Sequence, residues 1–176
     1  MINASGFGTL LAMKEFSSQA IEQTKSFLEG KNFPVENSKV GNLEVSYWII
    51  PQSLNPTLPD FAFRMTNTDS ATGEVLGIFG VSESVPQELR PYWAAHEIIE
   101  FTQIGIGKEG RCEEAEKTVV NLLPDNLRRQ YIDKRILFFS NLVNFFQQEL
   151  IKSTEDYTEN DVKEAQDSLA YLQSLI

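Results

Sequence analysis

Histidine, cysteine and basic residues are scarce in this chain of 176 residues, and each shortage excludes a class of protein. The single cysteine, Cys112, cannot form an internal disulfide, which excludes a disulfide-stapled secreted domain and fits a reducing cytoplasm. The single histidine, His96, cannot supply the paired Glu-x-x-His units of a diiron carboxylate protein. With 15 Lys and Arg against 25 Asp and Glu, the formal net charge of −10 argues against binding DNA or RNA.

Long apolar runs are also missing. No stretch approaches the roughly 18 consecutive apolar residues of a membrane-spanning helix. Residues 1–13 lack a basic head and their apolar run is broken by glycines, so we expect neither a signal peptide nor a membrane anchor. At 41% hydrophobic residues the chain can bury its own core. We therefore expect a single cytoplasmic domain over residues 1–176, with residues 125–176 as a helical extension packed on it.

The periodicity of apolar residues predicts an α+β fold. Residues 14–29 carry apolar side chains at helical spacing, which predicts an N-terminal helix that ends near Gly30. The segments 43–50, 61–65 and 75–81 are β-rich and separated by turn residues or prolines. We expect about three strands in a small antiparallel meander, with strand 75–81 at its edge.

After Pro124 the pattern predicts two more helices that form a C-terminal helical bundle. The first begins at Asp125 or Asn126 and runs to about Lys152, and the second begins at the capping sequence that starts with Thr158. The longer helix carries many aromatic residues on more than one face. We interpret this aromatic run as core, and a homodimer or partner interface is the alternative.

The chemistry of the chain is concentrated in residues 94–100, on a predicted helix that Pro91 opens. His96, Glu97 and Glu100 fall on one arc of this helix, and residues four apart lie about 5–6 Å from each other at Cβ. His96 and Glu100 could therefore hold one metal ion, while Glu97 acts as general base toward a water on it. The alternative is a half-buried amphipathic helix whose solvated face happens to carry these three residues.

The order of elements around this helix carries a family resemblance. A strand and a short loop precede it, and a second helix runs from Cys112 to a stop at Pro124. Residues 78–124 resemble the core of the ImmA/IrrE type of zincin-like metallopeptidase, in which an A-H-E-x-x-H helix is followed by an E-x-E-A helix that ends in L-L-x-P. The matching residues are Ala95, His96, Glu97, Glu114, Ala115, Leu122, Leu123 and Pro124, although one residue of the family pattern is missing just before Pro124.

Two metal-ligand positions depart from the family pattern. Glu100 stands where the family has its second histidine, and Cys112 stands where it has a glutamate. Both are acceptable zinc ligands, so the resemblance implies a zinc site of His96, Glu100 and Cys112, in which Glu113 or Glu116 could replace Cys112.

The resemblance leaves two functions open. Because a carboxylate in place of an imidazole weakens the Lewis acidity of the ion, we expect a degenerate zincin-like scaffold without peptidase activity that acts as a binding or regulatory protein. A peptide or protein partner would then lie along strand 75–81 by strand addition. The alternative is a zinc-dependent peptidase or hydrolase that uses His96, Glu97 and Glu100.

Overall fold

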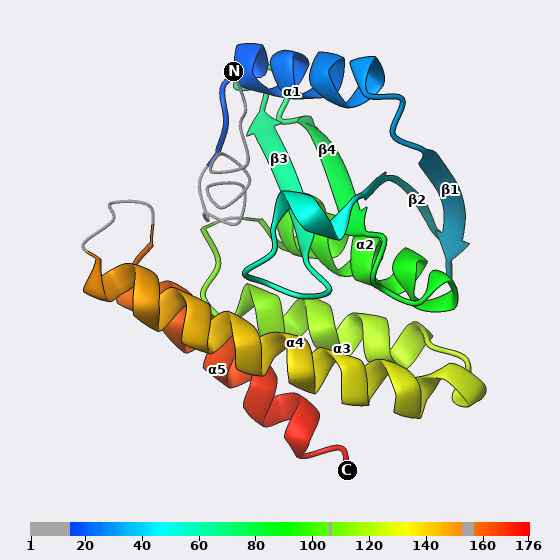
Figure 1. Cartoon of the computed structure of the whole chain (residues 1–176), viewed down its shortest axis with the longest axis vertical. Coiled ribbons are helices and arrows are strands. Elements are labelled where there is room, and N and C mark those ends of the chain that lie inside the picture. Colours follow the sequence, from blue (N-terminus) through cyan, green and yellow to red (C-terminus); the bar gives the residue numbers. More distant parts are fainter. Residues whose placement is uncertain (1–14, 106, 153–156) are drawn as a thin grey trace.

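The computed structural model describes residues 15–105, 107–152 and 157–176, so the expectation for residues 1–13 lies outside the described part. The described residues form the predicted α+β fold (Figure 1). The helices are α1 (Ser18–Gly30), α2 (Arg90–Ile98), α3 (Arg111–Leu122), α4 (Asp125–Ile151) and α5 (Glu159–Gln173), with the short helices η3 (Gln52–Leu54), η4 (Gln87–Leu89) and η5 (Ile99–Ile104). The strands are β1 (Val35–Val40), β2 (Leu43–Ile50), β3 (Ala62–Thr68) and β4 (Val75–Ser82).

The sheet corrects three of the expectations. It has four strands among the described residues, in the order β1-β2-β4-β3, where about three were predicted. Strand β1 was missed because it is polar at Asn37, Ser38 and Lys39 and leaves most of its residues partly or fully exposed, as an edge strand does.

The predicted antiparallel meander and the predicted edge strand are both wrong. Strands β2 and β4 pair in parallel from Trp48 to Ile50, so the sheet is mixed. After β2 the chain crosses to the far edge to form β3, and β4 then returns between β2 and β3. Strand 75–81 is therefore central, and β3 is the edge strand on that side. The apolar pattern of a strand does not show whether that strand pairs with the preceding strand or lies further along the sheet, with a later strand between them.

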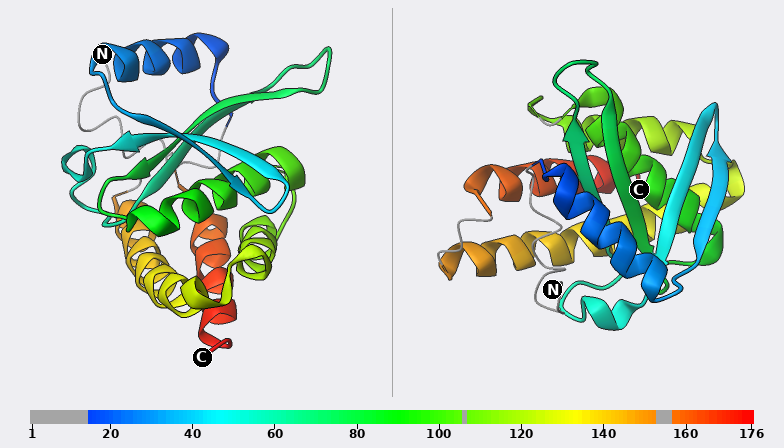
Figure 2. Two further views of the ribbon diagram at one scale, coloured as in Figure 1. Left: turned by 90° about the vertical axis from the view of Figure 1, so that its right-hand side faces the viewer. Right: turned by 90° about the horizontal axis from the view of Figure 1, so that it is seen from above.

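Helices cover the sheet on both faces. Helix α1 lies across one face and α2 packs under the other, while α3, α4 and α5 form a further layer beneath α2 (Figure 2). This arrangement buries α2 between the sheet and the C-terminal helices. Ser17 caps α1 by accepting a hydrogen bond from the Ala20 amide, as its N-cap position favours.

The interpretation of His96 and Glu100 as residues of a solvated helix face is wrong, because both side chains are buried. Trp93, Ala94, Ala95, His96 and Ile98 are all buried. The Trp93 indole Nε1–H donates to the Asp60 carbonyl at 2.9 Å, which ties the helix to the loop after β2.

The C-terminal helices follow the sequence prediction. Helix α4 begins directly after Pro124, and α5 begins with the capping box of Thr158 and Asp161. The interpretation of the aromatic run as core is confirmed for Phe138, Phe139 and Phe146, which are buried. None of the described helices combines the length and the apolarity needed to cross a membrane.

Candidate metal site

His96 stands at the centre of a buried cluster of potential metal ligands. Its Nε2 atom lies 3.2 Å from Glu100 Oε2 and 3.5 Å from Cys112 Sγ, and the three donor atoms lie within 4.8 Å of one another. A tetrahedral zinc ion with ligand bonds of about 2.0–2.3 Å holds its ligand atoms roughly 3.3–3.8 Å apart, which the two distances from Nε2 nearly match. The group could hold a metal ion.

Three consecutive elements bring these donors together. His96 lies on α2, Glu100 lies in the π-helical turn η5 that continues it, and Cys112 lies in the first turn of α3. The turn η5 ends at Gly105, whose positive φ of 97° lets the chain reverse toward α3. Short π-helical turns often occur at functional sites.

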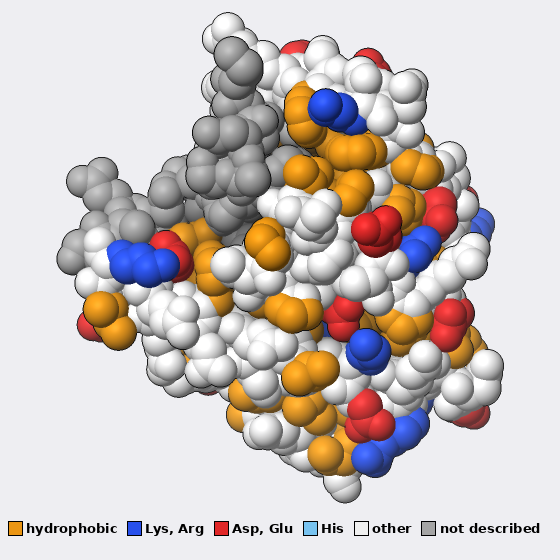
Figure 3. Space-filling model, viewed as in Figure 1, with side chains coloured by type: hydrophobic (Ala, Val, Ile, Leu, Met, Phe, Trp, Pro, Cys, Tyr) orange, Lys and Arg blue, Asp and Glu red, His pale blue; other side chains and the backbone are white. Residues whose placement is uncertain are grey.

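The cluster is almost closed to solvent. Only 1% of the surface of His96, 3% of that of Glu100 and 5% of that of Cys112 is exposed. No histidine side chain is visible on the face of the molecule that Figure 3 shows. An ion in this cluster would be held inside the protein.

Each ligand has a partner that orients it. Glu116 Oε2 lies 2.8 Å from His96 Nδ1 and forms an ion pair with the imidazole. Arg111 Nε donates to Glu100 Oε1 at 3.0 Å, which leaves Oε2 toward His96. The Cys112 amide donates to Glu164 Oε2 of α5 at 3.3 Å. Such partners behind the ligands are typical of metal sites.

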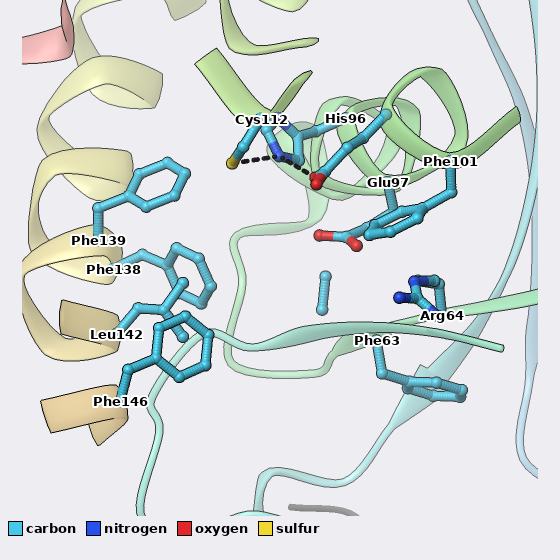
Figure 4. A pocket seen from close by; sticks show the side chains of 12 residues that line it. Phe63, Arg64, His96, Glu97, Phe101, Cys112, Phe138, Phe139, Leu142 and Phe146 are labelled. Carbon is cyan, nitrogen blue, oxygen red and sulfur yellow. Dashed lines mark hydrogen bonds and ion pairs between the residues drawn. The ribbon is translucent and has the colours of Figure 1, made fainter. Parts of the chain in front are cut away.

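Beside the cluster lies a hollow of about 50 Å³ (Figure 4). Since a cavity needs roughly 10–15 Å³ of volume to hold one water molecule, the hollow has room for a few of them. Glu97 points into it, opposite the phenylalanines of α4. Its walls are Ala62, Phe63, Arg64, His96, Glu97, Glu100, Phe101, Cys112, Phe138, Phe139, Leu142 and Phe146.

The pKa values of His96 and Cys112 are both raised in this cluster. Burial and Arg135 act to lower the pKa of His96, but Glu116 and Cys112 outweigh them and raise it well above its usual value. Burial, reinforced by the charge of Glu100, raises the pKa of the Cys112 thiol to about 11. In the metal-free protein both groups therefore carry a proton at neutral pH.

The arginines beside Glu100 and Glu116 help to lower the pKa values of these two carboxyl groups. Burial raises the pKa of Glu116, but Arg135 and His96 outweigh it and bring the pKa to about 2. Burial also acts against ionisation of Glu100, yet His96 and Arg111 lower its pKa. Burial and the charge of Glu100 raise the pKa of Glu97 against the opposing effects of His96, Arg135 and Arg64. A carboxyl group with a raised pKa is suited to exchanging protons near neutral pH.

The structure separates the candidate residues into three positions. It brings His96, Glu100 and Cys112 together and places Glu97 on the hollow next to them. Glu116 lies on the other side of the imidazole, at Nδ1. Glu113 is directed elsewhere, because its carboxylate pairs with Lys117 Nζ at 2.6 Å.

Arginines near the cluster escaped the sequence analysis. Arg64 of β3 is 2% exposed, and its guanidinium lies 3.7 Å from the centre of the Phe101 ring. Burial lowers its pKa to about 10. Arg135 sits in the middle of the aromatic run and is also buried. A charged residue inside an apolar segment was the available signal for both.

No family model matches the chain, and no curated protein and no solved structure is significantly similar to it. The resemblance to zincin-like metallopeptidases therefore remains a prediction carried by the motif residues.

Proposed function

We propose that this protein binds a zinc ion through His96, Glu100 and Cys112 on a zincin-like scaffold and acts as a binding or regulatory protein without peptidase activity. The observation that carries the proposal is the convergence of the three donor atoms within 4.8 Å at the Nε2 side of one buried imidazole.

The donor set and its charge favour zinc. Imidazole, carboxylate and thiolate are the three side-chain ligands that zinc commonly takes in proteins. Binding a divalent ion here would release the extra proton of His96 and the thiol proton of Cys112. Two positive charges would leave as two arrive, so the net charge of the buried cluster would not change. This balance limits the cost of placing an ion in the interior.

The size of the hollow supports a role other than peptide hydrolysis. A peptidase must bring a backbone carbonyl to the ion, together with the chain on both sides of it. The ligands here are almost fully buried, and a hollow of about 50 Å³ does not accommodate a peptide. The two anionic ligands would further reduce the Lewis acidity of the ion.

Elemental analysis tests the zinc site. Protein purified without chelators is expected to carry about one zinc per chain, and His96→Ala is expected to lose it while circular dichroism shows that the chain remains folded. Glu113→Gln is the matched control, because Glu113 is an acidic neighbour that pairs with Lys117 instead. Full zinc content in His96→Ala, or none in the wild type, would remove the proposal.

Hydrolysis of a small substrate is a second candidate function. Three protein donors leave a fourth coordination position open, as in catalytic zinc sites. Zinc bound there supplies Lewis acidity and an acidified water. Glu97, which points into the hollow beside the donors, is placed to accept a proton from such a water and to pass it to a leaving group.

Replacing Glu97 separates the two candidates. If the protein is a hydrolase, zinc-loaded wild type cleaves small esters or amides, and Glu97→Gln keeps its zinc but loses at least about 100-fold in kcat. If the protein works by binding alone, wild type and variant are equally inactive. Turnover that survives in Glu97→Gln would exclude Glu97 as the general base.

A further inference from the structure

We infer that Glu116 and Arg135 form a positioning pair that fixes the orientation of His96 and sets the affinity of the metal site. The inference rests on the proposed zinc site, and it assigns a role to helix α4, which supplies none of the three donors.

The first step is the placement of the two imidazole nitrogens. Nε2 faces Cys112 and Glu100, and Nδ1 faces Glu116, which lies four residues after Cys112 on α3. Helix α3 therefore reaches both sides of the ring. Glu116 Oε2 lies 2.8 Å from Nδ1 and pairs with it by charge, so it is the group placed to keep a proton on that nitrogen.

The second step is the way in which Glu116 is held. Arg135 Nε donates to both carboxylate oxygens of Glu116 at 3.1 Å, and Arg135 Nη2 donates to Glu116 Oε2 at 2.7 Å. Both residues are 0% exposed. This bidentate geometry fixes the plane of the carboxylate as well as its charge. Without Arg135, Glu116 would be a buried anion that lacks the cation holding it in place.

The third step is the way in which Arg135 is held. Its guanidinium carbon lies 4.9 Å from the ring centre of Trp93, 5.0 Å from that of Phe138 and 4.6 Å from that of Phe139. Aromatic rings at these distances attract a cation and leave it little freedom to move. The aromatic residues of α4 and Trp93 of α2 thus hold a cation that in turn holds the carboxylate behind His96.

A carboxylate at Nδ1 has a specific chemical effect on a metal-binding histidine. It keeps the proton on Nδ1, so that the lone pair of Nε2 is available for the ion, and it makes that lone pair more basic. Loss of such a partner typically lowers metal affinity by about 10- to 100-fold. A pair with a purely structural role would affect folding but not this affinity.

The test compares zinc affinities of metal-free full-length proteins by competition with a chromophoric chelator. The double variant Glu116→Gln/Arg135→Met removes both charges, so that no buried charge is left without its partner. We expect it to bind zinc about 10- to 100-fold more weakly than the wild type. The matched control is Arg129→Met/Asp133→Asn, which removes an exposed ion pair on the same helix and is expected to leave the affinity unchanged.

A second variant decides the question if the double variant does not fold. Glu116→Asp keeps the charge next to Arg135 but withdraws the carboxylate from Nδ1 by one methylene group. It is expected to weaken zinc binding while the cobalt-loaded protein keeps its thiolate-to-metal charge-transfer band, because Cys112 is untouched. Wild-type affinity in either folded variant overturns the positioning role and leaves the zinc site standing. A wild type that binds no zinc overturns both.

Discussion

The Arg135→Met variant is expected to lose about 3–5 kcal/mol of unfolding free energy in the metal-free state, because removing one partner of a buried ion pair leaves the other charge uncompensated. Arg135 and Glu116 are both fully buried, and Arg135 donates three hydrogen bonds to the Glu116 carboxylate. Methionine fills most of the space and keeps contact with the aromatic rings, so the loss is mainly electrostatic. Equilibrium unfolding in urea measures it.

The double variant Glu116→Gln/Arg135→Met separates charge from shape. Replacing both members of a buried pair by neutral residues is often close to neutral for stability, so we expect the double variant to recover most of the loss. An equal loss in the single and double variants would mean that packing around Arg135, and not the unpaired carboxylate, determines the stability. A loss below about 1 kcal/mol in the single variant would place the pair in the range of solvent-exposed ion pairs.

Local signals in the sequence were sufficient for the helices. Helices α4 and α5 start where Pro124 and Thr158 predicted, because caps and prolines act on neighbouring residues only. Strand β1 and the crossover past β4 could not be found in the same way. The first depends on the partner that a polar edge strand meets, and the second depends on the order in which distant strands assemble.

In the candidate site too, the sequence predicted some residues and not others. The four-residue spacing of His96 and Glu100 was enough to place them together, and the family resemblance was enough to add Cys112. The supporting arginines come from β3, α3 and α4, and no spacing rule connects them to α2. The sequence marked Arg64 and Arg135 only as charges inside apolar segments, which indicates that each needs a buried partner but does not identify it.

The zinc affinity of the proposed site is expected to rise steeply with pH. Zinc takes the neutral form of a histidine and the anionic form of a cysteine. In the metal-free protein Glu116 and Cys112 raise the pKa of His96 against the opposing effect of burial, and burial raises that of Cys112 to about 11. Zinc must therefore displace two protons at neutral pH.

The direction and size follow from this proton count. Each released proton makes the dissociation constant fall about tenfold per unit of rising pH, so two protons give about 100-fold per unit below both pKa values. Glu100 adds nothing to the slope, because His96 and Arg111 lower its pKa and it is already ionised. Titrations across neutral pH, corrected for the protonation of the competing chelator, measure the slope. Calorimetry in buffers of different ionisation enthalpy counts the protons directly.

Cys112→Ser provides the control for the pH dependence. A serine hydroxyl binds as a neutral group in this range, so the variant is expected to bind more weakly and with a slope of about one proton. A wild type that binds zinc with no slope would mean that Cys112 is not a ligand, because a thiolate forms only with loss of the thiol proton. A slope of one in the wild type would mean either that one of the two residues is not bound or that His96 is already neutral before zinc binds, and comparison with His96→Ala and Cys112→Ser would identify which.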